Sequence, residues 1–501
     1  MTFAKVIWFK SLMACGNGLT MCNLAITLAD YRGAGFVVAP AGFGKTYLIA
    51  EATALSDGRQ LILTHTYAGV NALRRKFRIL GVNEHQFHVD TIASWALRLC
   101  LSYKHTSGWA IERPADNDQW NALYAAVGDL LDHEFVRRII RSSYVGLYVD
   151  EYQDCSISQH AIVMKISRDL PCRVLGDPLQ GIFDFGGQQS VDWTRDVEGV
   201  YAQVGQLDVP HRWVQAGAGQ LGEWLRNVRE NLENGTTIDL RRRLPQGVRY
   251  VAANAAPQDL QRTQGNTCRY FNCGPGQTII AIHKGSQEFK AKCHRLSQNL
   301  SGRYSSIEEV EGRDMFAFFR RMNTAASNSR RLQEVIAFAG KCMTQVNANL
   351  PAGTCRGEAV TIRAATRSPE VARLANEYLD NPSSGRLAEL LKAIKGLAQT
   401  NVTRADLLNR VLGVLQKHTM HPELSCDEAA EKYQREFRFK GRPVGNLRQI
   451  GTTLLVKGLE YDHAIVLDAT TLSRKELYVA LTRGARTLTI VSTNPVLNPA
   501  A

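Results

Sequence analysis

A run of carboxylates directly behind an apolar segment is the first feature of the sequence that suggests chemistry. In LYVDEYQDCS, residues 147–156, the apolar residues 147–149 are followed by Asp150, Glu151 and Asp154. The apolar triplet predicts a buried strand, and neighbouring carboxylates repel one another unless a cation lies close by. The cluster is therefore either part of a cation site that activates water or an acidic turn that water solvates.

A glycine-containing loop upstream favours the first of these interpretations. Residues 36–38 (FVV) predict a short strand, 39–46 (APAGFGKT) a loop, and 47–55 a helix. This strand–loop–helix order, with Lys-Thr at its end, is the pattern of a phosphate-binding P-loop. Gly42 and Gly44 allow backbone N–H groups to turn toward phosphate oxygens, and the helix N-terminus adds its positive end.

The two motifs together predict a magnesium–nucleotide site. Lys45 would reach the β- and γ-phosphates, and Thr46 would hold Mg²⁺. Asp150 would hold the same ion, directly or through water, while Glu151 would orient and deprotonate the attacking water. The first loop position is Ala39, where the motif usually has Gly. The predicted nucleotide-binding residues are Ala39, Pro40, Ala41, Gly42, Phe43, Gly44, Lys45 and Thr46.

Four further segments occur in a definite order along the chain. They are RQLILTHTYAGVNALRRKF (59–77), CRVLGDPLQGIFDFGG (172–187), TTLLVKGLEYDHAIVLDA (452–469) and RKELYVALTRGARTLTIVS (474–492). With the P-loop and the DExQD segment, this set resembles the UvrD/Rep-like branch of superfamily 1 DNA helicases, and the resemblance covers both ends of the chain. It implies an α/β fold with two RecA-like P-loop domains, parallel sheets, ATP as the nucleotide and Mg²⁺ as the cofactor.

The resemblance also implies roles for single residues. Gln180 would sense the γ-phosphate and couple it to DNA contacts. Arg212 and Arg483 would reach the γ-phosphate from the second RecA-like domain, where a planar, permanently charged guanidinium stabilises phosphoryl transfer. His211 would stack on adenine, and Glu460 would contact the nucleotide.

The track for nucleic acid is implied in the same way. Bases stack on aromatic rings with little sequence preference, although core packing would explain Phe183 and Phe185 as well. Single-stranded or tailed duplex DNA is the expected partner, and RNA stays open because stacking and phosphate contacts serve both. The candidate DNA-binding residues are Thr64, His65, Tyr67, Thr91, Phe183 and Phe185.

Four positions depart from the family pattern. Asn23 stands where a glutamine reads adenine, His211 replaces a tyrosine, Gly186 replaces an arginine, and Leu454 replaces a histidine that faces DNA. These changes concern nucleotide selection and DNA coupling rather than phosphate chemistry. The resemblance implies an ATP-hydrolysing 3′-to-5′ translocase or helicase. Two alternatives stay open: a DNA-stimulated ATPase subunit of a larger complex, with a partner such as a nuclease, and a non-catalytic nucleic-acid-binding scaffold.

Bulk composition agrees with a polyanionic partner. Lys and Arg number 60 against 47 Asp and Glu, a net charge of +13, which favours nucleic acid. The eleven cysteines are scattered, as in a reducing cytoplasm. Cys268, Cys273, Cys293 and His294 match no compact zinc spacing. Lys10 interrupts the apolar N-terminal residues, and no later segment is apolar over about twenty residues, so we expect a cytoplasmic protein without a membrane span.

The order of the motifs predicts the domain limits. DQWNALYAAVGDLLDHEFVRRII, SPEVARLANEYLD and SGRLAELLKAIKGLAQ have apolar residues at helical spacing, which predicts helices in both insertions. The expected limits are 1–95 and 146–205 for the first RecA-like domain, 96–145 for a small helical insertion, 206–309 and 440–501 for the second RecA-like domain, and 310–439 for a helix-rich insertion.

Overall fold

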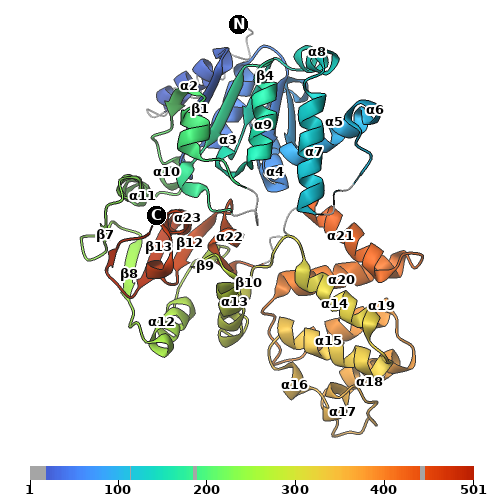
Figure 1. Cartoon of the computed structure of the whole chain (residues 1–501). Helices are drawn as coiled ribbons and strands as arrows, with labels where there is room; N and C mark the ends of the chain where they lie inside the picture. The colour runs from blue at the N-terminus through green and yellow to red at the C-terminus, as the bar shows by residue number, and fades with distance from the viewer. Residues whose placement is uncertain (1–17, 113, 115, 184–188, 441–445, 501) are drawn as a thin grey trace. The chain divides into compact units, whose positions relative to one another are not determined.

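The structure, a computed structural model, describes residues 18–112, 114, 116–183, 189–440 and 446–500. Contacts within the chain divide it into two compact units, Met1–Asn234 and Gly235–Ala501 (Figure 1). Each unit contains one six-stranded sheet. Among the described residues, no helix combines the length and the apolar character needed to cross a bilayer. The domain limits given above remain a prediction.

The sheet of the first unit is parallel throughout, in the order β3-β2-β4-β5-β1-β6. Every residue of β2, β4 and β5 is buried, as expected for strands of a parallel sheet that helices cover. The strands are β1 (Ala34–Val38), β2 (Gln60–Thr64), β3 (Phe87–Thr91), β4 (Gly146–Val149), β5 (Cys172–Gly176) and β6 (Ala202–Gln206).

Helices connect these strands, and side chains fix several of their starts. Thr66 accepts a hydrogen bond from the Gly69 N–H at the start of α4, and Ser156 and Gln159 form a capping box on α9. The helix predicted from DQWNALYAAVGDLLDHEFVRRII is confirmed as α7 and α8. The helices are α2 (Gly18–Asp30), α3 (Lys45–Leu55), α4 (Tyr67–Ile79), α5 (Ile92–Ser102), α6 (Lys104–Ser107), α7 (Asn117–Leu130), α8 (Glu134–Ser143), α9 (Ile157–Ile166), α10 (His211–Gln215) and α11 (Gly219–Glu233).

The second unit repeats the same architecture. Its sheet is also parallel, in the order β10-β11-β9-β12-β13-β8, with a separate antiparallel pair of β14 and β7. The predicted α/β fold class, with two parallel sheets, is confirmed. The strands are β7 (Ile238–Asp239), β8 (Val248–Ala252), β9 (Ile279–His283), β10 (Ser305–Ser306), β11 (Arg448–Thr452), β12 (Tyr461–Val466), β13 (Gly484–Ser492) and β14 (Val496–Leu497).

Among the described residues between β10 and β11, eight consecutive helices follow one another, α14 to α21. Their apolar faces form a core of their own, and the two helices predicted from SPEVARLANEYLD and SGRLAELLKAIKGLAQ are confirmed as α18 and α19. The helices of the second unit are α12 (Pro257–Arg269), α13 (Gln287–Asn299), α14 (Arg313–Thr324), α15 (Asn328–Cys342), α16 (Val346–Asn349), α17 (Ala352–Cys355), α18 (Pro369–Asp380), α19 (Ser384–Lys395), α20 (Ala405–Met420), α21 (Cys426–Lys440), α22 (Thr453–Val456) and α23 (Arg474–Leu481).

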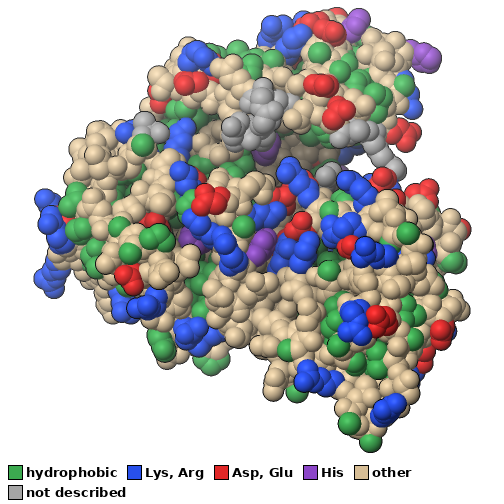
Figure 2. Space-filling view, turned by 60° about the horizontal axis from the view of Figure 1, so that its bottom comes forward, with side chains coloured by type: hydrophobic (Ala, Val, Ile, Leu, Met, Phe, Trp, Pro, Cys, Tyr) green, Lys and Arg blue, Asp and Glu red, His purple; other side chains and the backbone are tan. Residues whose placement is uncertain are grey.

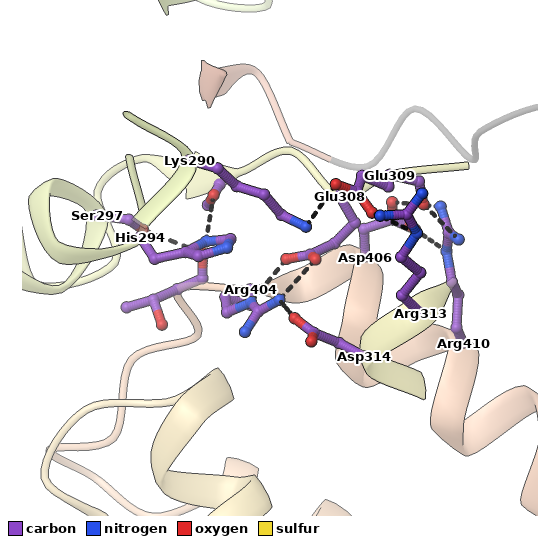
Figure 3. A network of polar contacts seen from close by, with 12 residues as sticks. Lys290, His294, Ser297, Glu308, Glu309, Arg313, Asp314, Arg404, Asp406 and Arg410 are labelled. Atoms are coloured by element: carbon purple, nitrogen blue, oxygen red, sulfur yellow. Dashed lines mark hydrogen bonds and ion pairs between the residues drawn. The ribbon is translucent and has the colours of Figure 1, made fainter. Parts of the chain in front are cut away.

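A buried ion-pair cluster ties these helices to the chain that follows β10 (Figure 3). Arg404, at the start of α20, donates to both carboxylate oxygens of Glu308 at 2.7 and 2.6 Å and also pairs with Asp314 of α14. His294, Glu308 and Asp314 place ligand atoms close enough together for a metal ion. Because Arg404 already donates to both carboxylates, we interpret the cluster as a structural ion-pair network and not as a metal site.

Candidate active site

The loop between β1 and α3 has the backbone shape that phosphate binding requires. Gly42 and Gly44 have φ of 78° and 99°, in the left-handed region that side chains with a Cβ rarely adopt. A Cβ on Gly44 would also lie 2.8 Å from Met21 Cε. Helix α3 begins at Lys45 without a side-chain cap, so its first N–H groups are suited to an anion.

The predicted P-loop lysine lies beside both predicted carboxylates. Lys45 Nζ is 2.7 Å from Glu151 Oε1 and 3.4 Å from Asp150 Oδ1, with the Lys45 and Asp150 side chains 9% and 4% exposed. Burial opposes the charged ammonium, but the two carboxylates more than offset it and raise the pKa of Lys45. Burial raises the pKa of Asp150 to about 6, although Lys45 acts in the opposite direction. The structure thus brings Lys45, Asp150 and Glu151 into one charged cluster.

Glu151 is held in an uncommon backbone conformation. Its φ is 56° and its ψ 42°, a left-handed geometry that persists in a residue with a Cβ only when its surroundings enforce it. The Glu151 N–H donates to Asp150 Oδ1 at 2.9 Å, and the Gln153 amide donates to Glu151 Oε2 at 2.6 Å. The carboxylate itself is about one third exposed, so water can reach it.

Asp177, at the end of β5, connects the phosphate loop to Gln180. Its Oδ2 accepts hydrogen bonds from the Ala41 N–H at 3.0 Å and the Gln180 amide at 2.8 Å. Its own N–H donates to Gln153 Oε1 at 3.0 Å. Sequence reasoning assigned no role to Asp177 or Gln153. One sequence feature could have indicated a role for Asp177: it follows a predicted buried strand, just as Asp150 does. The carboxyl ends of parallel strands meet at one edge of a sheet.

Helix α10 lies directly against the phosphate loop. The Arg212 N–H donates to the Gly42 carbonyl at 2.9 Å, and the fully buried Trp213 packs edge-on against Phe43. His211 lies near Gly44, and burial lowers its pKa, which favours the neutral imidazole. Arg212 and His211 therefore belong to the first compact unit, while the resemblance had implied the second domain for Arg212. Their roles remain predictions.

Glu460 and Arg483 belong to the second unit. Arg483 is 2% exposed and donates to the carbonyls of Val479 at 2.8 Å and Leu459 at 3.1 Å. Its Nη2 also donates to Thr482 Oγ1 at 2.9 Å. Glu460 is exposed and directly precedes β12. The nucleotide contacts predicted for these two residues stay predictions.

The candidate nucleic-acid residues fall into two environments. Thr64 is fully buried beneath Gly69, and Thr91 is 3% exposed and caps α5, so both hydroxyls are placed inside the fold. His65 and Phe183 are half-buried, with ring centroids 6.2 Å apart. The hydroxyl of the half-buried Tyr67 is 2.5 Å from Ser94 Oγ. Phe185 and Gly186 lie outside the described residues.

The oxygen atoms near Lys45 suit a magnesium ion. Thr46 is half-buried at the start of α3, and Asp150 contributes a buried carboxylate at the end of β4. Hydroxyl and carboxylate oxygens are the ligands that Mg²⁺ takes beside a nucleotide. The residues present therefore fit the ion that the motifs predict.

A comparison with known families tests the resemblance drawn from the motifs. Residues 114–191 match the family model described as UvrD/REP helicase N-terminal domain. This stretch contains Asp150, Glu151, Asp177 and Gln180, so the resemblance to UvrD/Rep-like helicases is confirmed where the carboxylates and the glutamine lie. No curated protein matches the chain.

Two similar solved structures are helicases from an arterivirus. One is nonstructural protein 10 (helicase) in complex with DNA, at 10% identity and a TM-score of 0.34, covering 94% of this chain and 63% of that one. The other is the crystal structure of the same helicase, at 9% identity and a TM-score of 0.29, covering 94% and 61%. The chain thus spans about three fifths of their length, and scores this low support no inference about its function.

A buried carboxyl group on α3 makes stability depend on pH. Glu51 is 1% exposed, and its Oε2 has no hydrogen-bond partner among the residues that the structure describes. Burial raises the pKa of Glu51 to about 7, above the value of about 4.3 of an unfolded chain. The native state then binds this proton more tightly, so the Glu51 contribution to unfolding free energy falls as pH rises from about 4 to about 7.

We expect Glu51→Gln to remove the fall in unfolding free energy that Glu51 causes as pH rises. At pH 8 the variant should exceed the wild type in unfolding free energy by about 1–3 kcal/mol, and the difference should nearly vanish at pH 4.5. Urea unfolding at both pH values measures the difference. Glu134→Gln, at a side chain that is 68% exposed, is the matched control and should show no such trend. Parallel pH profiles for Glu51→Gln and wild type would contradict the prediction.

Proposed function

We propose that the chain is an ATP-dependent single-stranded-DNA translocase with helicase activity, moving 3′ to 5′ as the family resemblance implies. The observation that carries the proposal is one continuous polar path in the first unit. Lys45 pairs with Glu151, Glu151 accepts from Gln153, Gln153 accepts from the Asp177 N–H, and Asp177 accepts from Gln180. The phosphate-binding lysine is thereby linked to the glutamine that precedes the nucleic-acid segment.

The residues of this path have complementary tasks in ATP hydrolysis. Thr46 and Asp150 would hold Mg²⁺, which supplies positive charge to the phosphate oxygens. The N–H groups at the start of α3 and the Lys45 ammonium bind the phosphates. Glu151 accepts the proton of the attacking water, and Gln153 keeps its carboxylate oriented. Arg212 and Arg483 are the proposed arginines that stabilise the transferring phosphoryl group.

The nucleic-acid side of the proposal depends on Gln180 and the residues after it. Phe183 follows three residues later and lies beside His65, and two adjacent rings form a platform on which a base can stack. The excess of Lys and Arg, a net charge of +13, favours contacts with nucleic-acid phosphates. On the face drawn in Figure 2, Lys and Arg side chains occur at many places with Asp and Glu among them. Binding should therefore track the backbone and weaken with salt.

Steady-state ATP hydrolysis with and without DNA tests the proposal. Single-stranded DNA should raise the rate severalfold, and the stimulation should fall steeply as salt rises because phosphate contacts release counterions. An RNA of the same length tests the choice of track. Strand displacement on a duplex with a 3′ tail, compared with a 5′ tail, tests unwinding and polarity. A chain that binds ATP but hydrolyses none under these conditions would refute the translocase.

One alternative is favoured by specific residues. Leu454 of α22 is apolar where the family has a histidine facing DNA, and Asn23 of α2 is exposed where the family has a glutamine reading adenine. A DNA-stimulated ATPase subunit of a larger complex, with a partner such as a nuclease, would hydrolyse ATP without displacing a strand. ATP hydrolysis without displacement on either tailed duplex would favour this alternative. Absence of both activities would leave a nucleic-acid-binding scaffold.

A further inference from the structure

A buried arginine on α11 contacts the centre of the polar path. The apolar residues Leu221, Leu225, Val228 and Leu232 are buried along this helix, and Arg229 is buried with them at 4% exposure. Its Nη1 is 2.6 Å from Asp177 Oδ1, and its Nη2 is 2.8 Å from Glu233 Oε1. A long cationic side chain is rarely buried unless it is paired, so this placement requires an explanation.

One partner of Arg229 is Asp177, which accepts a hydrogen bond from the phosphate loop. Asp177 is fully buried, and its Oδ1 also accepts from the Leu179 N–H at 3.2 Å. Its other oxygen holds Ala41 of the phosphate loop and the Gln180 amide. Donors from the loop, from Gln180 and from α11 therefore converge on one carboxylate. The guanidinium is the charge that balances it in a site with little access to water.

We propose that Arg229 is a positioning residue for nucleotide turnover and acts through Asp177. Its guanidinium, 2.6 Å from Asp177 Oδ1, holds the carboxylate in one orientation, so that the other oxygen can accept from the Ala41 N–H and the Gln180 amide together. The expected effect of Arg229 on kcat rests on the proposed ATP hydrolysis. Its expected effect on the order of the phosphate loop does not. It also makes α11, which follows the predicted Arg212, a part of the machinery that holds the phosphate loop.

The same helix provides a matched control. Arg226 pairs with Glu223 at 2.7 Å, with both side chains about half exposed. Arg226→Met and Arg229→Met remove the same cation from the same helix, but only the second removes it from Asp177. Arg229→Lys retains a positive charge in a buried setting and lacks the planar fork, so it should fold and rescue part of the effect.

Hydrogen exchange of the phosphate loop gives a readout that does not require ATP hydrolysis. In Arg229→Met, the amides of residues 39 and 41–46 should exchange at least about tenfold faster than in the wild type, because the Ala41 N–H loses an oriented acceptor. Arg226→Met should leave this exchange unchanged, and Arg229→Lys should lie between. Unchanged exchange in folded Arg229→Met would overturn the proposal, whether or not the protein hydrolyses ATP.

Kinetics then test whether Arg229 acts through Asp177. Arg229→Met should lower kcat by about 10–100-fold with KM for ATP changed less than about threefold, because an interaction that orients catalytic groups affects the chemical step more than binding. In a double-mutant cycle, Asp177→Asn and Arg229→Met/Asp177→Asn should have the same kcat within twofold. A double variant much slower than Asp177→Asn would show that Arg229 acts by another route.

The double variant also covers the case in which Arg229→Met fails to fold. It removes the buried charges of Arg229 and Asp177 together, while Glu233, which also loses its partner, is 41% exposed and can be solvated by water, so the double variant should fold. Absence of ATP hydrolysis by the wild-type protein would refute the proposed function. Faster hydrogen exchange of the phosphate loop in Arg229→Lys or Arg229→Met would still support the positioning role. The two failures are therefore distinguishable.

Discussion

Replacing Glu151 by glutamine should lower the rate of ATP hydrolysis by about 10²–10⁴-fold, because a positioned general base contributes a factor of this size. The Glu151 carboxylate is about one third exposed and accepts a hydrogen bond from Gln153 at 2.6 Å. Glutamine has nearly the same shape but cannot take a proton from water. ATP binding should persist because the phosphate loop and Lys45 are unchanged. Phosphate release measures the rate, and calorimetric titration measures the affinity.

The Glu151→Gln experiment has a control in the same unit. Glu134→Gln makes the same chemical change on α8, at a side chain that is 68% exposed and pairs with Arg137 and Arg141 of the same helix, and should leave the rate unchanged. Glutamine also keeps a Cβ, so the left-handed backbone at residue 151 is equally strained in both proteins. Wild-type turnover in Glu151→Gln would remove Glu151 from the role of general base.

The parts of the site that were predictable from sequence are those that depend on local patterns. The strand before the phosphate loop, the glycines within it and the helix after it are adjacent in the chain, so their types and spacing predict their geometry. Asp150 and Glu151 could be placed beside Lys45 because parallel strands end at one edge of a sheet. The helices α18 and α19 were predictable for a similar reason, since apolar spacing and a breaker mark their limits.

The remaining parts depend on contacts between distant residues. Arg229 and Asp177 are 52 residues apart in the sequence. The chain has 60 Lys and Arg residues, and a single sequence does not show which of them are buried. Thr64 has the residue type of a DNA contact, but Gly69 of the next helix covers it. The left-handed conformation of Glu151 is imposed by its surroundings, because its own side chain disfavours it. Tertiary packing decides each of these features.

Removing the Lys45 ammonium should affect both nucleotide binding and stability. We expect Lys45→Met to lose measurable ATP hydrolysis and to bind ATP at least about tenfold more weakly, because the cation that contacts the β- and γ-phosphates is gone. The same change leaves Asp150 and Glu151 without the ammonium at 3.4 and 2.7 Å. Breaking a buried ion pair costs about 3–5 kcal/mol, and we expect about 2–3 kcal/mol here at pH 8 because Glu151 is partly exposed.

The stability loss of Lys45→Met should depend on pH in a definite direction. The pKa of Asp150, about 6 in the wild type, will rise further because Lys45 lowers it. A folded-state pKa above the unfolded value means that stability falls as pH rises through that interval. The difference from wild type should therefore widen between pH 6 and 8 and narrow below pH 5. Lys165→Met, which breaks a partly exposed pair with Asp132, should change stability by less than about 1 kcal/mol at either pH. Urea unfolding of the wild type, Lys45→Met and Lys165→Met at pH 5 and pH 8 measures these differences. If Lys45→Met lost the same unfolding free energy at both pH values, Asp150 would not depend on Lys45 for its charge.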